Sequence, residues 1–150
     1  IAISLAAVTR AVMIAVISII TFKLLIDIEI TNYLTLISFT FLSSFILGNV
    51  GIIAGLWSEK FDNMATVTNF VIVPLSFLSG TFYTIDRLPS FLQTISEFNP
   101  FFYMIDGFRY SFIGKADGSI TIGLIYLIIL SFVTWFITYL LYKKGYKIKS

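Results

Sequence analysis

The stretch "NPFFYMIDGFRYSFIGK", residues 99–115, does not have the pattern of a membrane-spanning helix, although the runs around it do. Asn99 suits the N-cap of a helix and Pro100 its first residue, so a helix is predicted from Phe101 to about Ile113. Such a helix is about 20 Å long, too short to cross a hydrocarbon layer of about 30 Å. Asp106 and Arg109 share one face of it and are predicted to pair there.

The preceding segment, residues 88–98, has the pattern of an amphipathic helix with Pro89 in its first turn. Its apolar face consists of Leu88, Phe91, Leu92, Ile95 and Phe98. Two short apolar helices joined at an Asn-Pro corner predict a re-entrant hairpin over about 88–114, with this apolar face packed inward. The alternative is an amphipathic pair that lies flat on the membrane surface.

Composition indicates that the solvent of the chain is a lipid bilayer. It is 58% hydrophobic and 12% charged, whereas about a quarter of the residues in a soluble domain carry charge. The chain has no cysteine and no histidine, which excludes disulfides, thiolate zinc sites and histidine acid–base chemistry. No catalytic, metal or cofactor site is predicted, and the net charge of +2 does not indicate nucleic acid.

Four apolar runs are long enough to cross a membrane, which takes about 20 helical residues. They cover about 5–26, 33–56, 64–83 and 120–142. Arg10 and Lys23 are placed near the ends of the first run, where their side chains can snorkel, and Pro74 is expected to kink the third. The predicted fold is an all-α, polytopic membrane bundle of four transmembrane helices, with the re-entrant hairpin between the last two.

Charge in the short flanks predicts the orientation. The tail "KKGYKIKS" holds four lysines (Lys143, Lys144, Lys147 and Lys149), so the C-terminus is expected in the cytoplasm. With four crossings, residue 1 is then cytoplasmic too and residues 84–119 face outward. Ile1 follows no start methionine or charged leader, so the chain is expected to be the C-terminal portion of a longer protein.

Glycines in the second run predict close helix packing. Gly48, Gly51 and Gly55 lie on it, and "GIIAG" is a GxxxG pattern that lets two helix backbones approach in lipid. The alternative is that glycine is simply common in membrane helices.

The region from 61 to 114 resembles the signature of permease subunits of type-2 ABC transporters. The matching residues, in order, are Pro74, Phe77, Leu78, Gly80 and Tyr83, then Leu88 and Pro89, then Asn99, Pro100 and Tyr103, and finally Arg109. The resemblance extends over essentially the whole chain, whose four runs correspond to the last four of the family's six spans.

This resemblance implies a function that periodicity does not show. Family members work as pairs, each copy bound to a cytoplasmic ATPase subunit, and their short helices between the fifth and sixth spans form a lid on the outer side of the export path. A homodimeric permease of a drug- or polysaccharide-type bacterial exporter in the inner membrane is therefore expected, in contact with lipid and with no nucleic acid. The family's first two spans and coupling helix would precede Ile1, and a chain without them could not couple to an ATPase in the usual way.

Other classes of function fit the sequence less well than a transporter permease does. "GFRYSFIGKA" (107–116) lacks the spacing and the Ser or Thr of a phosphate loop, so ATP hydrolysis is expected in a partner. A proton-coupled antiporter needs an ionisable residue deep in a span, and the last three runs have none. An intramembrane hydrolase would need a histidine or a pair of aspartates on its spans, and this chain has neither. A small channel, scaffold or secondary transporter stays open. The abundance of Phe, Ile, Leu, Ser and Thr in the runs favours an amphiphilic or lipid-linked substrate.

Overall fold

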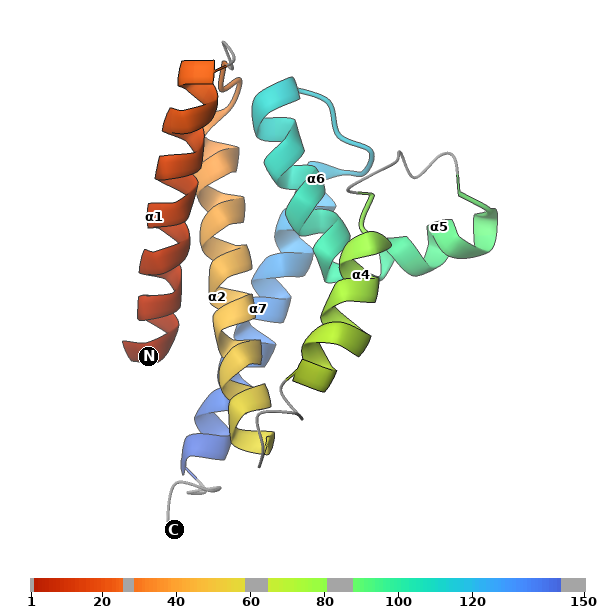
Figure 1. Ribbon diagram of the computed structural model, residues 1–150. Helices are drawn as coiled ribbons and strands as arrows, with labels where there is room; N and C mark the ends of the chain where they lie inside the picture. The colour runs from red at the N-terminus through yellow and green to blue at the C-terminus, as the bar shows by residue number, and fades with distance from the viewer. Residues whose placement is uncertain (1, 26–28, 59–64, 81–87, 144–150) are drawn as a thin grey trace.

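The computed structural model describes residues 2–25, 29–58, 65–80 and 88–143, and this part of the chain is helical without a strand (Figure 1). The elements in order are α1 (Ala2–Leu25), α2 (Tyr33–Trp57), η1 (Thr68–Ile72), α4 (Val73–Phe77), α5 (Ser90–Glu97), α6 (Pro100–Ile113) and α7 (Ile120–Lys143). In this described part, α1, α2 and α7 are long and apolar enough to cross a membrane. The prediction of an all-α chain is confirmed for the described residues, and three of the four predicted spans are helices of the length and apolar character that a crossing needs.

The third predicted span differs from the other three. Its helical run, Ala65–Phe77, is shorter than a membrane crossing needs. Residue 64 and residues 81–83, the predicted ends of this span, lie outside the described residues. The fourth crossing therefore stays a prediction.

Pro74 disturbs this helical run in a specific way. The turn directly before it, η1, is π-helical, and the N–H of Val73 donates to the carbonyl of Thr68, five residues back. Proline offers no N–H to the carbonyl four residues back, and its ring crowds that carbonyl. A wider turn relieves the clash, so the disturbance expected at Pro74 takes the form of a π-helical turn.

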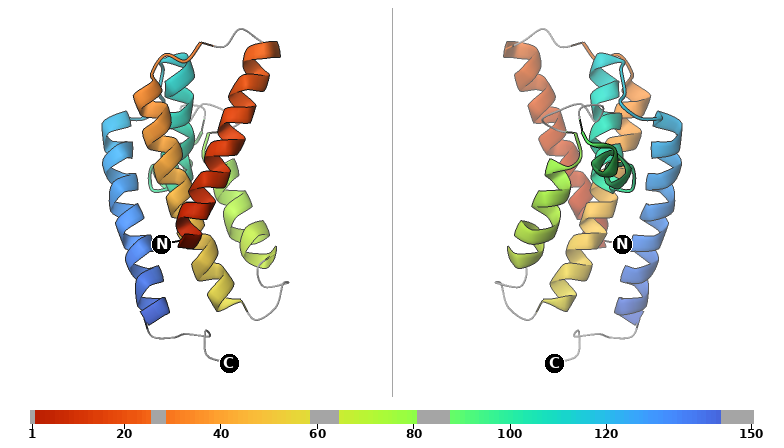
Figure 2. Two further views of the ribbon diagram at one scale, coloured as in Figure 1. Left: turned by 90° about the vertical axis from the view of Figure 1, so that its left-hand side faces the viewer. Right: turned by 90° about the vertical axis from the view of Figure 1, so that its right-hand side faces the viewer.

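Helix α2 is the centre of the packing. It lies against α1, α6 and α7, and the buried core between these helices contains Phe39, Ile46, Met104 and Leu127. Among the described elements, α4 packs against α6 and η1 packs only against α4, and neither packs against α1, α2 or α7. The η1–α4 segment therefore lies apart from the three long helices, and Figure 2 shows it on the opposite side of the molecule from α7.

Two glycines mark the closest approaches to α2. A Cβ at Gly107 of α6 would lie 2.1 Å from the ring of Phe39, and one at Gly48 of α2 would lie 2.8 Å from the Cβ of Ala7. Gly51 and Gly55, in contrast, are exposed, and a Cβ at Gly51 would meet no atom within 4 Å. Within this chain, Gly48 lies at a close contact between helices, whereas Gly51 does not.

The contact between α1 and α2 also fixes their register. The hydroxyl of Ser4 donates to the side-chain oxygen of Asn49 over 3.2 Å, and both residues are buried. The two helices are antiparallel, and α1 begins partway along α2 (Figure 1). A buried hydroxyl–amide bond between helices is a common means of association in lipid.

Candidate functional site

The corner between α5 and α6 has the local structure that its sequence predicts. Asn99 is the N-cap of α6, its side chain accepts a hydrogen bond from the N–H of Phe101, and Pro100 is the first helical residue. Gly114 ends the helix with φ of 71°, a left-handed conformation that favours glycine. These predictions about the second short helix are confirmed.

Side chains of the hairpin complete the hydrogen bonding at the end of α4. Three carbonyls there, those of Leu75, Leu78 and Gly80, form what we call the α4 carbonyl cluster. Asn99 Nδ2 donates to Leu75 over 2.6 Å, Ser96 Oγ to Leu78 over 2.9 Å and Arg109 Nη2 to Gly80 over 2.6 Å. The last carbonyls of a helix have no partner within it. The hairpin supplies these partners and thereby joins α4 to α5 and α6.

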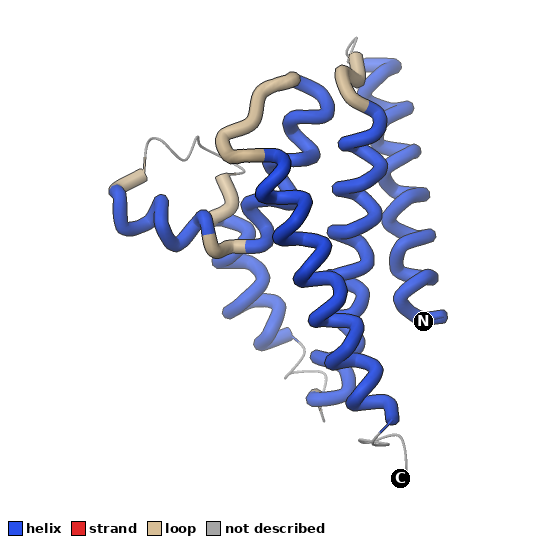
Figure 3. The backbone as a smooth tube through the Cα atoms, turned by 180° about the vertical axis from the view of Figure 1, so that it is seen from behind, coloured by secondary structure: helices blue, strands red, loops and turns tan. Residues whose placement is uncertain are grey.

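Arg109 and Asp106 do not pair with each other, so that prediction is wrong. Arg109 Nη1 instead lies 2.6 Å from the carboxylate of Asp117, in the loop between α6 and α7. The two carboxylate oxygens of Asp106 accept the backbone N–H groups of Asp117 and Gly118, over 2.8 and 2.9 Å. Asp106 is buried, and these two N–H donors compensate the cost of burying its carboxylate. Both residues therefore hold the same loop, which runs beside α6 (Figure 3).

Two tyrosines, one on α6 and one on α7, lie at the corner between α5 and α6. The hydroxyl of Tyr126 donates to the carbonyl of Phe98 over 2.9 Å, and its ring lies 5.1 Å from that of Tyr103. Tyr103 also packs on Gly123, where a Cβ would lie 2.9 Å from its ring. Burial raises the pKa of the Tyr103 phenol. The phenol is therefore uncharged at neutral pH.

The apolar face of α5 does not pack inward, contrary to the prediction. Phe91 and Phe98 are 73% and 74% exposed and Ile95 is 36% exposed, whereas Ser96 is fully buried. Ser96 occupies the inner side because its hydroxyl bonds the α4 carbonyl cluster. The apolar face is thus free to meet lipid or another protein surface. Leu88 and Leu92 are half-buried.

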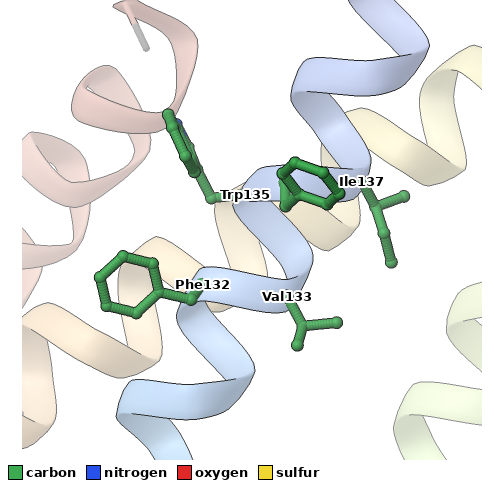
Figure 4. Close-up of a pocket in the computed structure, with 5 residues that line it drawn as sticks. Phe132, Val133, Trp135 and Ile137 are labelled. Atoms are coloured by element: carbon green, nitrogen blue, oxygen red, sulfur yellow. The ribbon is translucent and has the colours of Figure 1, made fainter.

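Two hollows lie on the long helices. One of about 330 Å³ follows α7 and is lined by Phe132, Val133, Trp135, Phe136 and Ile137 (Figure 4). Another of about 230 Å³ lies where Phe45 of α2 faces Ser131 and Trp135. Both are open and apolar. Among the described residues, no group of three or more acidic, cysteine or histidine side chains could hold a metal ion.

The structure brings together only some of the residues singled out by sequence. Gly80, Asn99 and Arg109 meet at the α4 carbonyl cluster, and Tyr103 and Asp106 lie nearby on α6. Pro74 and Pro89 are exposed and shape the helices on which they lie. Tyr83 lies outside the described residues.

Sequence reasoning passed over Ser96, Asp117, Tyr126 and Asn49, all of which make the contacts described above. Only Asn49 had a signal that could have been read, because it is an amide within an apolar run.

Comparisons with known proteins agree with this architecture. Residues 1–113 match the family model described as "ABC-2 type transporter". The chain is 35% identical over 111 residues to the "Inner membrane transport permease YadH" of Escherichia coli strain K12, and equally to that of Shigella flexneri. The match covers 73% of this chain and 43% of each relative, so the chain spans less than half the length of those relatives. No solved structure is significantly similar.

The family match covers well over half of the chain, and it includes α1, α2, the η1–α4 segment and the whole α5–α6 hairpin. The chain therefore belongs to the ABC-2 type transporter family.

Proposed function

We propose that residues 1–150 are the C-terminal part of the transmembrane domain of an ATP-driven exporter in a bacterial cytoplasmic membrane. The observation that carries this proposal is the family match over residues 1–113, which includes the hairpin with its polar contacts. The relatives that match are named as inner membrane transport permeases. The protein contributes the path for the substrate and is not itself an enzyme.

The energy for transport comes from a separate ATPase subunit on the cytoplasmic side, and two copies of the permease form the path between them. The lysine-rich C-terminal tail favours the cytoplasm for that end of α7. The apolar character of the long helices supports an amphiphilic substrate of the drug, lipid-linked or polysaccharide type.

The α5–α6 hairpin is re-entrant and forms a lid at the outer end of the path. Its corner is hydrogen-bonded to Tyr126, six residues into α7, which corresponds to a depth of about 9 Å. Irregular backbone is tolerated at such a depth where protein satisfies its polar groups. The bonds from Ser96, Asn99 and Arg109 to the α4 carbonyl cluster meet this requirement. They support the re-entrant arrangement over a pair lying flat.

Copurification tests the proposed dependence on a partner. The natural protein that contains this chain is solubilised in mild detergent and isolated by an affinity tag. We expect a separate ATPase subunit to copurify with it and ATP hydrolysis to require that subunit. A preparation of the permease alone that hydrolysed ATP would contradict the proposal.

A further inference from the structure

The two apolar hollows on α7 adjoin each other, because Phe132 and Trp135 line both of them. The larger one, of about 330 Å³, extends along the helix to Ile137 (Figure 4). Its walls are turned away from the core, since Phe132 and Phe136 are 66% and 54% exposed. On a helix long and apolar enough to cross a membrane, a hollow of this kind is open to the hydrocarbon layer.

A cation stands on the same face of α7 as this hollow. Phe132, Phe136, Tyr139 and Lys143 follow one another at intervals of four, three and four residues, which keeps them within about 60° around the helix. Lys143 lies in the last turn and is exposed, and within the described part of the chain it forms no ion pair. The hollow and the ammonium group are therefore aligned along the helix.

The distance between the hollow and Lys143 matches the dimensions of a phospholipid. Ile137 precedes Lys143 by six residues and Phe132 precedes it by eleven, so the hollow lies about 9–17 Å from the lysine along the helix. The acyl chains of one leaflet extend over about 15 Å, half of a hydrocarbon layer of about 30 Å. Between the two lies Tyr139, whose ring stacks on Trp135 at 6.0 Å, and such aromatic residues gather where hydrocarbon meets the headgroups.

We propose that the hollow and Lys143 form a binding site for one anionic phospholipid. One acyl chain lies along Phe132 and Phe136, and the phosphate pairs with the ammonium group of Lys143. An apolar helix would fill the hollow as well but would leave the lysine unpaired, whereas an anionic phospholipid satisfies both. Basic residues at the end of a membrane span attract anionic lipids, and the lysine-rich sequence that follows Lys143 adds to this attraction.

Quenching of tryptophan fluorescence by brominated lipids tests the site. The natural protein that contains this chain is purified in dodecyl maltoside and titrated with phosphatidylglycerol or phosphatidylcholine, both with brominated acyl chains. Bromine quenches a tryptophan that it contacts, and Trp135 lines the hollow. The other tryptophan of the chain, Trp57, lies at the end of α2. No ATP is added, so the outcome is independent of the ATPase copurification test.

We expect phosphatidylglycerol to give saturable quenching that is lost in Trp135→Phe and retained in Trp57→Phe. Lys143→Gln should weaken its binding about fivefold, the effect of one basic residue near an anionic lipid, and should leave phosphatidylcholine unaffected. The control is Lys115→Gln, at an exposed lysine of the loop before α7, which should change neither lipid.

A second pair of variants tests the hollow itself. Val133→Phe adds a ring to its lining and should weaken the binding of both lipids, because less room is left for an acyl chain. Ile129→Phe, one turn away on α7 at an exposed residue outside the lining, should leave both unchanged.

Three outcomes would overturn the proposal. The first is equal affinity for phosphatidylglycerol in Lys143→Gln and in the unsubstituted protein, which would separate the lysine from the site. The second is quenching that Val133→Phe and Ile129→Phe leave equally unchanged, since the chain would then lie elsewhere. The third is no quenching of Trp135 by either lipid together with a lower dimer fraction in Val133→Phe, which would assign the hollow to a second copy of the protein.

Discussion

Arg109 and Asp117 form an ion pair of 2.6 Å across the turn that leads from α6 to α7, and the same guanidinium holds the carbonyl of Gly80. One side chain thus joins three segments: the end of α4, helix α6 and the loop before α7. The two partners are only 23% and 19% exposed in their side chains, so the pair is partly shielded from water. In an outer lid, such a contact would hold the hairpin against the ends of the neighbouring helices.

Substituting Arg109 should therefore loosen the hairpin. Arg109→Gln removes the ion pair and the charged donor to Gly80, and we expect a loss of about 1.5–3 kcal/mol in the free energy of unfolding, the range for hydrogen bonds to charged groups. Thermal unfolding in detergent measures it, with export measured in parallel. Lys115→Gln, at an exposed cation in the adjacent loop, is the control. Equal unfolding midpoints for the two variants would show that the contacts of Arg109 with Asp117 and Gly80 do not stabilise the fold.

Asp106 should show a graded response. Asp106→Ala leaves the N–H groups of Asp117 and Gly118 without their acceptor, at a cost of about 1–3 kcal/mol for each group kept from water. Asp106→Asn keeps one acceptor oxygen and should cost less. Thermal unfolding of the two variants gives the order. If Asn and Ala were equally damaging, the carboxylate would matter for its charge and not for these two bonds.

Ser96 and Thr94 provide a matched pair on α5. The Ser96 hydroxyl is buried and lies 2.9 Å from the carbonyl of Leu78 as well as from that of Leu92 in its own helix, whereas the exposed Thr94 hydroxyl bonds only within its own helix. Ser96→Ala should lower the unfolding midpoint, since a carbonyl at the end of α4 loses its donor, at a cost of about 1 kcal/mol. Thr94→Ala should leave the midpoint unchanged. Equal effects would mean that the hairpin does not cap α4.

Gly107 and Gly51 test the packing on α2. Gly107→Ala places a methyl group against the ring of Phe39 and should destabilise the bundle by about 1–3 kcal/mol, as overpacking does. The methyl group added by Gly51→Ala would meet no atom within 4 Å, so this variant is the control for replacing a glycine within a helix. Fluorescence-detected unfolding of the purified variants compares them. A Gly51 variant as damaged as the Gly107 variant would instead indicate an intermolecular contact at the GxxxG face.

Local sequence signals predicted much of the fold. The long apolar runs gave α1, α2 and α7, and the Asn99-Pro100 corner and Gly114 gave the start and end of α6, because capping depends on neighbouring residues alone. The end of the third run was predicted wrongly, at residue 83. Its hydropathy resembles that of a span, whereas the described helix ends at Phe77.

Long-range partners were not predictable in the same way. Periodicity placed Phe91, Ile95 and Phe98 on one face of α5, but it could not say whether that face meets protein or lipid, since both are apolar. Spacing placed Asp106 and Arg109 on one face as well, but the loop that carries Asp117 offers each of them a different partner.

Site-specific labelling tests most directly whether the hairpin is a re-entrant element on the outer face. The chain has no cysteine, so Lys115→Cys, Met104→Cys and Lys147→Cys each introduce a single target for an impermeant maleimide added to intact cells. Lys115 is exposed and Met104 is buried in the core. Residue 147 lies outside the described residues, in the lysine-rich tail that we propose to be cytoplasmic. We expect labelling at 115 from outside, at 147 only after the cells are opened, and at 104 in neither case. Labelling of 147 from outside, or of 104 in intact cells, would contradict the account.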